Sequence, residues 1–139
     1  MKKTLLLIML FTGTFVMSGC GESKNVKAED LMHHRFVLIK ANGQDISADK
    51  NAELEFGENM NIYGKMCNRF VAKVELENET IKGPGVSMAK IACDDEQLSK
   101  LDDTIAQLIQ DGASVSLDKE QLTLKNKDIE LIYQLKDLM

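Results

Sequence analysis

The sequence predicts a mainly β protein with one α-helix, in which seven or eight strands form an antiparallel sheet that curls or packs on itself. Three observations lead to this prediction. Apolar and polar residues alternate with period two over most of the chain after Arg35, which is typical of strands with one buried face. Turn-forming residues divide this pattern into short segments. A single segment, residues 94–110, has helical spacing instead.

The predicted strands are identified by their alternating apolar residues. The first strand contains Phe36 and Leu38 and ends at the turn sequence Asn42-Gly43. The apolar residues of the later strands are Ala52, Leu54 and Phe56; Phe70, Ala72, Val74 and Leu76; Ala113, Val115 and Leu117; Leu122 and Leu124; and Ile129, Leu131, Tyr133 and Leu135. Short strands at this spacing, with few helices between them, favour an antiparallel sheet that curls or packs on itself.

The predicted helix begins at Asp94 and ends at Gln110, with Gly112 as its C-terminal stop. Its apolar residues recur at helical spacing and form one face; they are Leu98, Leu101, Ile105, Leu108 and Ile109. We expect this face to fill the interior of the curled sheet, because small domains pack their interiors densely. The aromatic residues expected around it are Phe36, Phe56, Phe70 and Tyr133. The alternative is a helix that leaves an apolar cleft open to a lipid chain or a hydrophobic drug.

Charge and composition restrict the classes of function. The chain has 139 residues, the size of one domain, and its 17 basic and 22 acidic residues give a net charge of −5. Because nucleic-acid binding requires a cationic face, we expect no nucleic-acid partner. His33 and His34 are adjacent and diverge on a helix or strand, so they cannot easily bind one ion, and we predict no metal site. We also expect no cofactor. A soft-ligand copper site is the alternative for the methionines and cysteines, but core packing and a disulfide explain these residues more simply.

The N-terminal segment is predicted to be a signal peptide, residues 1–19. Two lysines are followed by an apolar run of about a dozen residues, which is too short to span a bilayer. The sequence Met17-Ser18-Gly19-Cys20 resembles the lipobox of bacterial lipoproteins, which implies that Cys20 is lipidated. Gly21, rather than Asp, follows this cysteine, and by resemblance this favours the outer membrane. An ordinary secretory signal with an incidental cysteine is the alternative.

The remaining chain is divided into a flexible tether, residues 20–27, and one domain, residues 28–139. Cys67 and Cys93 are then an even pair in an oxidising compartment, which predicts a disulfide. Such a bond would stabilise the domain by about 3 kcal/mol through the entropy of the unfolded chain. The alternative is two buried, unpaired thiols.

Residues 64–70 read GKMCNRF and resemble the G-x-x-C-N-x-F motif of the META domain family. Further similarity to the family lies in residues 33–38 with Asn42-Gly43, in residues 88–93 (MAKIAC), and in the closing segments 121–124 and 131–133. The resemblance covers about residues 30 to 139 and extends to the lipoprotein signal. It implies an incomplete β-barrel crossed by a helix. It also implies an envelope lipoprotein associated with heat induction and novobiocin resistance, with no established catalytic residues.

Asn68 and Arg69 are the candidate binding residues, because they form a polar pair where strands are expected to bend. The alternatives are that Asn68 only satisfies backbone groups and that Arg69 only covers the surface. The chain has no G-x-S-x-G, no H-E-x-x-H and no phosphate-binding glycine loop.

We therefore expect a non-enzymatic lipoprotein that faces the periplasm from the outer membrane. Its lipid would attach it to the membrane, and it would bind an envelope protein or an apolar ligand. The alternative is a small periplasmic enzyme, a hydrolase, with a site assembled from dispersed residues.

Overall fold

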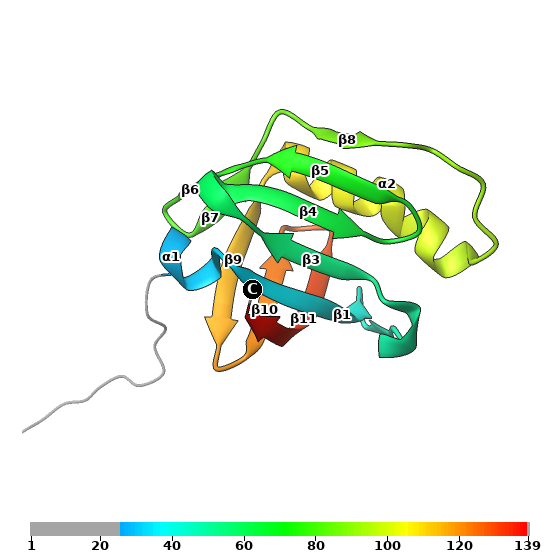
Figure 1. Ribbon diagram of the computed structural model, residues 1–139, viewed down its shortest axis with the longest axis horizontal. Coiled ribbons are helices and arrows are strands. Elements are labelled where there is room, and N and C mark those ends of the chain that lie inside the picture. Colours follow the sequence, from blue (N-terminus) through cyan, green and yellow to red (C-terminus); the bar gives the residue numbers. More distant parts are fainter. Residues whose placement is uncertain (1–25, 139) are drawn as a thin grey trace, which may run out of the picture.

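The computed structural model describes residues 26–138 (Figure 1). The predicted signal peptide, Cys20 and most of the predicted tether lie outside the described residues. Within them, the main helix is α2 (Glu96–Asp111), and α1 (Ala28–Leu31) is a single turn. The strands are β1 (His34–Ala41), β2 (Gln44–Asp45), β3 (Glu53–Phe56), β4 (Asn61–Lys65), β5 (Arg69–Lys73), β6 (Glu75–Glu77), β7 (Thr80–Lys82), β8 (Val86–Met88), β9 (Ala113–Asp118), β10 (Gln121–Lys125) and β11 (Glu130–Leu138).

All strand pairs are antiparallel, in the order β6-β7-β9-β10-β11-β1-β3-β4-β5-β8, with β2 paired to β1. The two ends of this order are joined by the chain itself. Only Val74 separates β5 from β6, and only residues 83–85 separate β7 from β8. One long, bent hairpin therefore brings the two ends of the sheet together, and the sheet curls into an incomplete barrel (Figure 1). The predicted mainly β fold with a curled antiparallel sheet and one main helix is confirmed.

The expected number of strands, seven or eight, is wrong: the described residues contain 11. The physical reason is the bend in the long hairpin. Val74 donates its N–H to the Met60 carbonyl at 3.2 Å, and Gly83 donates to the Ile109 carbonyl at 3.0 Å, so both leave the strand ladder. Pro84 has no N–H to donate. Two long strands are thereby divided into four, and the two-residue β2 adds another.

The apolar face of α2 lies inside the curl, and the helix runs behind β4 and β5 in Figure 1. Its apolar residues belong to the same buried cluster as the four aromatic residues expected around it; the helix contributes Leu98, Leu101, Ile105, Leu108 and Ile109. The helix begins at Glu96, and its N-cap is Asp95, one residue after Asp94, where the predicted segment begins. Gly112, with φ +97°, ends it as predicted. No helix among residues 26–138 is long and apolar enough to cross a membrane.

Candidate functional site

The G-x-x-C-N-x-F segment forms the tip of the β4–β5 hairpin. Gly64 lies directly opposite Phe70, whose side chain is buried in the core. A Cβ atom on residue 64 would overlap the ring of Phe70 and would lie 3.0 Å from the Glu53 carbonyl oxygen. A glycine at position 64 therefore makes room for the phenylalanine at position 70, which explains why these two residue types occur together.

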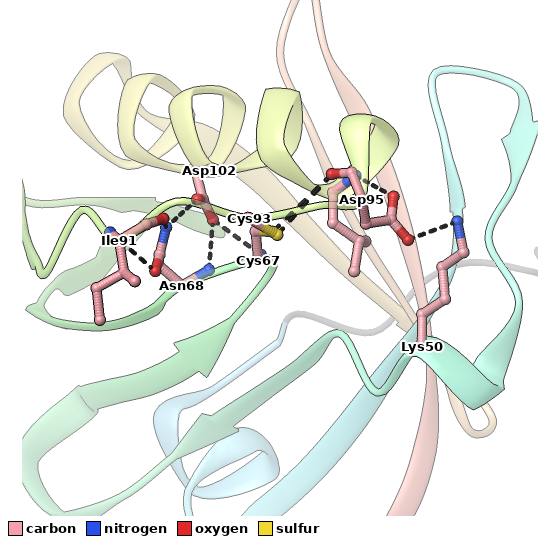
Figure 2. The surroundings of a disulfide bond; sticks show 8 residues. Lys50, Cys67, Asn68, Ile91, Cys93, Asp95 and Asp102 are labelled. Carbon is pink, nitrogen blue, oxygen red and sulfur yellow. Dashed lines mark hydrogen bonds and ion pairs between the residues drawn. A yellow bond between two sulfur atoms is a disulfide. The ribbon is translucent and has the colours of Figure 1, made fainter.

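Cys67 and Cys93 form a disulfide, the pairing predicted from the sequence (Figure 2). It joins the tip of the β4–β5 hairpin to the segment that leads into α2, with a distance of 6.2 Å between the two Cα atoms. The bond therefore connects the sheet to the N-terminal end of the helix that fills it.

The side chain of Asn68 uses its carboxamide on two partners (Figure 2). Its Nδ2 donates to Asp102 Oδ2 at 2.8 Å and to the Ile91 carbonyl at 3.1 Å, while its Oδ1 accepts from the Ile91 N–H at 3.2 Å. Asn68 thus holds the backbone of the segment after β8 as a neighbouring strand would. This geometry matches the alternative in which Asn68 satisfies backbone groups.

Asp102 is the residue that sequence reasoning missed. Its side chain, 3% exposed, comes from α2, and its Oδ1 accepts from the N–H groups of Cys67 at 2.9 Å and Asn68 at 3.0 Å. The Asn68 carboxamide also donates to Asp102, so the carboxylate accepts hydrogen bonds from three N–H groups. A buried charge requires hydrogen bonds of this kind. The signal was present in the sequence. Residue 102 is four after Leu98 and three before Ile105, so it places an acid on the apolar face of the helix.

We call the set Cys67, Asn68, Ile91, Cys93 and Asp102 the inner clamp. It combines one disulfide with five hydrogen bonds, and it fastens the hairpin tip, the segment before α2 and the middle of α2 to one another. Its polar groups are directed at one another or at the backbone (Figure 2). The inner clamp is therefore a structural connection between the sheet and the helix.

The N-terminus of α2 is held by a second connection. Asp95 Oδ1 accepts from the Leu98 N–H at 3.0 Å, and Asp95 Oδ2 lies 3.0 Å from Lys50 Nζ. The hydrogen bond from Leu98, followed by the one from Lys50, lowers the pKa of Asp95 below its usual value. Lys50 also donates to Gln97 Oε1 at 2.7 Å, so the loop before β3 is attached to the first turn of the helix.

Two other groups have shifted pKa values. The hydrogen bond and the charge of Asp103 raise the pKa of the exposed Lys90. Burial raises the pKa of Tyr133, whose hydroxyl has no hydrogen-bond partner among residues 26–138. Neither group lies beside another titratable group in a way that indicates acid–base chemistry, since Lys90 and Asp103 form a surface ion pair and Tyr133 is enclosed by the core.

Arg69 lies on the opposite side of the hairpin from the inner clamp. Strand alternation directs Phe70 inward, so Arg69 is exposed on the outer surface. Tyr63 and Val71 face each other on the same surface, each 46% exposed. We call five outward-facing residues of these two strands the outer patch; they are the half-buried Lys65 and the exposed Tyr63, Arg69, Val71 and Lys73. A cavity of about 380 Å³ adjoins it, and its lining includes Arg69, Lys65 and Tyr63.

The two histidines are directed to different partners. His33 Nε2 lies 3.2 Å from Glu58 Oε2 on the surface, and His34 Nδ1 lies 2.8 Å from the Met32 carbonyl oxygen. Met60 and Met66 are core residues, and the cysteines are joined to each other. No group of three or more His, Cys, Asp or Glu side chains within residues 26–138 is arranged to hold a metal ion.

Comparison with known proteins gives consistent similarities. The META domain model matches residues 29–137. Heat shock protein HslJ of Escherichia coli (strain K12) is 40% identical over 142 residues, which cover 100% of this chain and 99% of that protein. A protein solved by NMR has a TM-score of 0.76 and 44% identity, and the match covers 82% of this chain and 98% of that one. A Burkholderia xenovorans protein solved by NMR has a TM-score of 0.62 and 16% identity, and the match covers 86% of this chain and 99% of that one. This protein shares the fold.

Proposed function

The chain belongs to the META domain family, and from this premise we propose that it is a non-enzymatic lipoprotein of the bacterial outer membrane. It faces the periplasm, is attached through Cys20, and supports the envelope during heat stress and novobiocin exposure by binding an envelope component on its outer surface. The name of the relative HslJ, a heat shock protein, supports the link to heat stress. The sequence before residue 28 supports the lipid anchor.

The observation that carries this proposal is the contrast between a filled interior and an outer patch in which two large apolar side chains are exposed. The buried face of α2 and the inward residues of the strands form one continuous core. The polar groups of the inner clamp are used on one another. What the β4–β5 hairpin offers to another molecule is therefore its outer side, where Tyr63 and Val71 are each 46% exposed.

The test uses cells that lack this chain and are complemented with variants of it. We expect Tyr63→Ser combined with Val71→Ser to reduce survival in novobiocin and at high temperature to the level of Cys20→Ser. Ile91→Ser is the matched control, because Ile91 is 68% exposed, lies outside the outer patch, and contributes only its backbone to the inner clamp. Survival equal to wild type for the double variant, or an equal loss for Ile91→Ser, would contradict the proposal. Immunoblots of whole cells verify that each variant accumulates.

The membrane attachment of the chain is measured by fractionation of the same strains. Cys20→Ser is expected to leave the chain in the soluble periplasmic fraction or as an unprocessed precursor, since acyl chains on this residue would provide the anchor. Fractionation of this variant with the outer membrane, in processed form, would show that the lipoprotein assignment is wrong while leaving the outer patch open to test.

A further inference from the structure

Positive charge is concentrated on the outer patch in a protein whose net charge is −5. Lys65 and Arg69 are directly opposite each other in the β4–β5 pair, and Lys73 follows Arg69 on the same face of β5. Like charges opposite each other in an antiparallel pair repel and destabilise the sheet. Lys65 also lies directly opposite Glu53 in the β3–β4 pair, so the acids beside the outer patch decide how much of this repulsion is relieved.

The neighbouring acids are already engaged by other cations. Glu53 pairs with Lys136 at 2.7 Å, and Glu55 lies 3.5 Å from Arg35. Among residues 26–138, Lys65, Arg69 and Lys73 have no ion-pair partner. Three positive charges are thus left to meet an anion from outside the molecule.

The apolar part of the outer patch lies among these charges. Tyr63 and Val71 form a cross-strand pair one row away from the Lys65–Arg69 pair, and Lys73 lies on the other side of Val71. A tyrosine combines an apolar ring with a polar hydroxyl, and such side chains favour the boundary between water and lipid, where lysine and arginine also meet phosphates. This combination fits a membrane surface.

We propose that the outer patch docks on the anionic phosphate headgroups of the membrane that carries the lipid anchor, an inference that rests on the proposed anchoring at Cys20. The predicted tether has eight residues, 20–27, and a chain of that length reaches at most roughly 28 Å. The domain is then always held near the headgroups. Lys24 and Lys27, against Glu22, give the tether a positive charge as well.

The place where the described chain starts is compatible with this docking. In Figure 1 the chain enters at α1, which lies beside the sheet at the end where β4 begins and β5 ends. Lys73 and Asn61 form the row of the β4–β5 pair at that end. A tether leaving there lets the outer side of the hairpin turn toward the membrane.

The experiment uses residues 20–139 with Cys20→Ser, so that no lipid contributes to binding. The 44% identical relative solved by NMR corresponds to 82% of this chain, which indicates that the domain folds without its signal peptide. Binding is measured by sedimentation with vesicles of phosphatidylcholine, alone or with roughly one third phosphatidylglycerol, at low and at moderate salt. The patch variant is K65E/R69E/K73E. The control, K100E/K119E/K127E, has the same net charge but carries its changes on α2 and on the turns after β9 and β10.

We expect wild type to bind the anionic vesicles about tenfold more tightly than the neutral ones, with binding weakened by salt. The patch variant should bind them about tenfold more weakly than the control variant. Equal losses in the two variants, or equal binding to both kinds of vesicle, would overturn the proposal. Binding to polyglutamate but not to anionic vesicles would also overturn it and would assign an acidic protein to the patch. The vesicle experiment involves neither the lipid anchor nor a survival assay. Its failure would therefore contradict docking alone, and failure of the survival or fractionation experiments would contradict the proposed function.

Discussion

Asn68 and Arg69 are adjacent in the sequence, but they belong to two regions of the molecule with opposite roles. Asn68 is part of the inner clamp and makes three side-chain hydrogen bonds, to Asp102 and to the backbone of Ile91. Arg69 is part of the outer patch, where it is exposed and lies opposite Lys65. The inner clamp connects the sheet to the helix, whereas the outer patch leaves its charges unpaired within residues 26–138. A single family motif can therefore contain residues for folding beside residues open to binding.

The largest expected effect comes from removing the centre of the inner clamp. Asp102→Ala leaves the N–H groups of Cys67 and Asn68 and the Asn68 carboxamide without their buried acceptor. We expect the free energy of unfolding to fall by roughly 3 kcal/mol or more, because each unsatisfied buried donor is costly. Urea unfolding of residues 28–139, followed by circular dichroism, measures this.

Asp103→Ala is the matched control for that change. Asp103 is the next residue on α2, and its ion pair with Lys90, at 2.9 Å, is exposed to solvent. Solvent and salt screen an exposed pair of this kind, so this variant should unfold close to wild type. Equal destabilisation by the two substitutions would show that the loss of any carboxylate from α2 lowers the stability of the domain. The hydrogen bonds of Asp102 would then have no particular importance.

The second effect concerns the covalent part of the inner clamp. Replacing both Cys67 and Cys93 by alanine is expected to lower the free energy of unfolding by about 3 kcal/mol, because the unfolded chain gains freedom when its loop is opened. The Asp102 hydrogen bonds remain possible in this variant, so the fold should persist. Unfolding of the oxidised wild type that matches the double variant, together with two thiols that alkylate in freshly isolated protein, would contradict the disulfide.

The smallest expected effect lies on the outer patch. Arg69→Ala removes an exposed side chain with no ion-pair partner among the described residues and relieves its repulsion with Lys65, so the free energy of unfolding should change by less than about 0.5 kcal/mol. Asn68→Ala, one position earlier, should lower it by roughly 1 to 3 kcal/mol. A large loss for Arg69→Ala would remove the distinction between the two regions, since it would give this arginine a structural role.

Much of the fold could be predicted because it depends on local patterns. Period-two alternation predicts the strands, and helical spacing predicts α2, since each pattern gives one element a single apolar face. The bend in the long hairpin could not be predicted in this way. The N–H groups of Val74 and Gly83 bond to Met60 and Ile109, which are distant in the sequence, and so the ladder is interrupted where the local pattern continues.

By itself, the sequence determined which residues are apolar, where turns and the helix occur, and that two cysteines were available to pair. Only the tertiary structure decided what the polar residues of the motif do. Asp102 is 34 residues from Asn68 in the sequence, and α2 must lie inside the curl before its carboxylate can reach the hairpin tip. The outer patch likewise exists only through strand register, which places Lys65 beside Arg69. Net charge and residue spacing are properties of the linear sequence. Hydrogen bonds and charge repulsion depend instead on distances of a few ångströms between residues, and folding creates these distances.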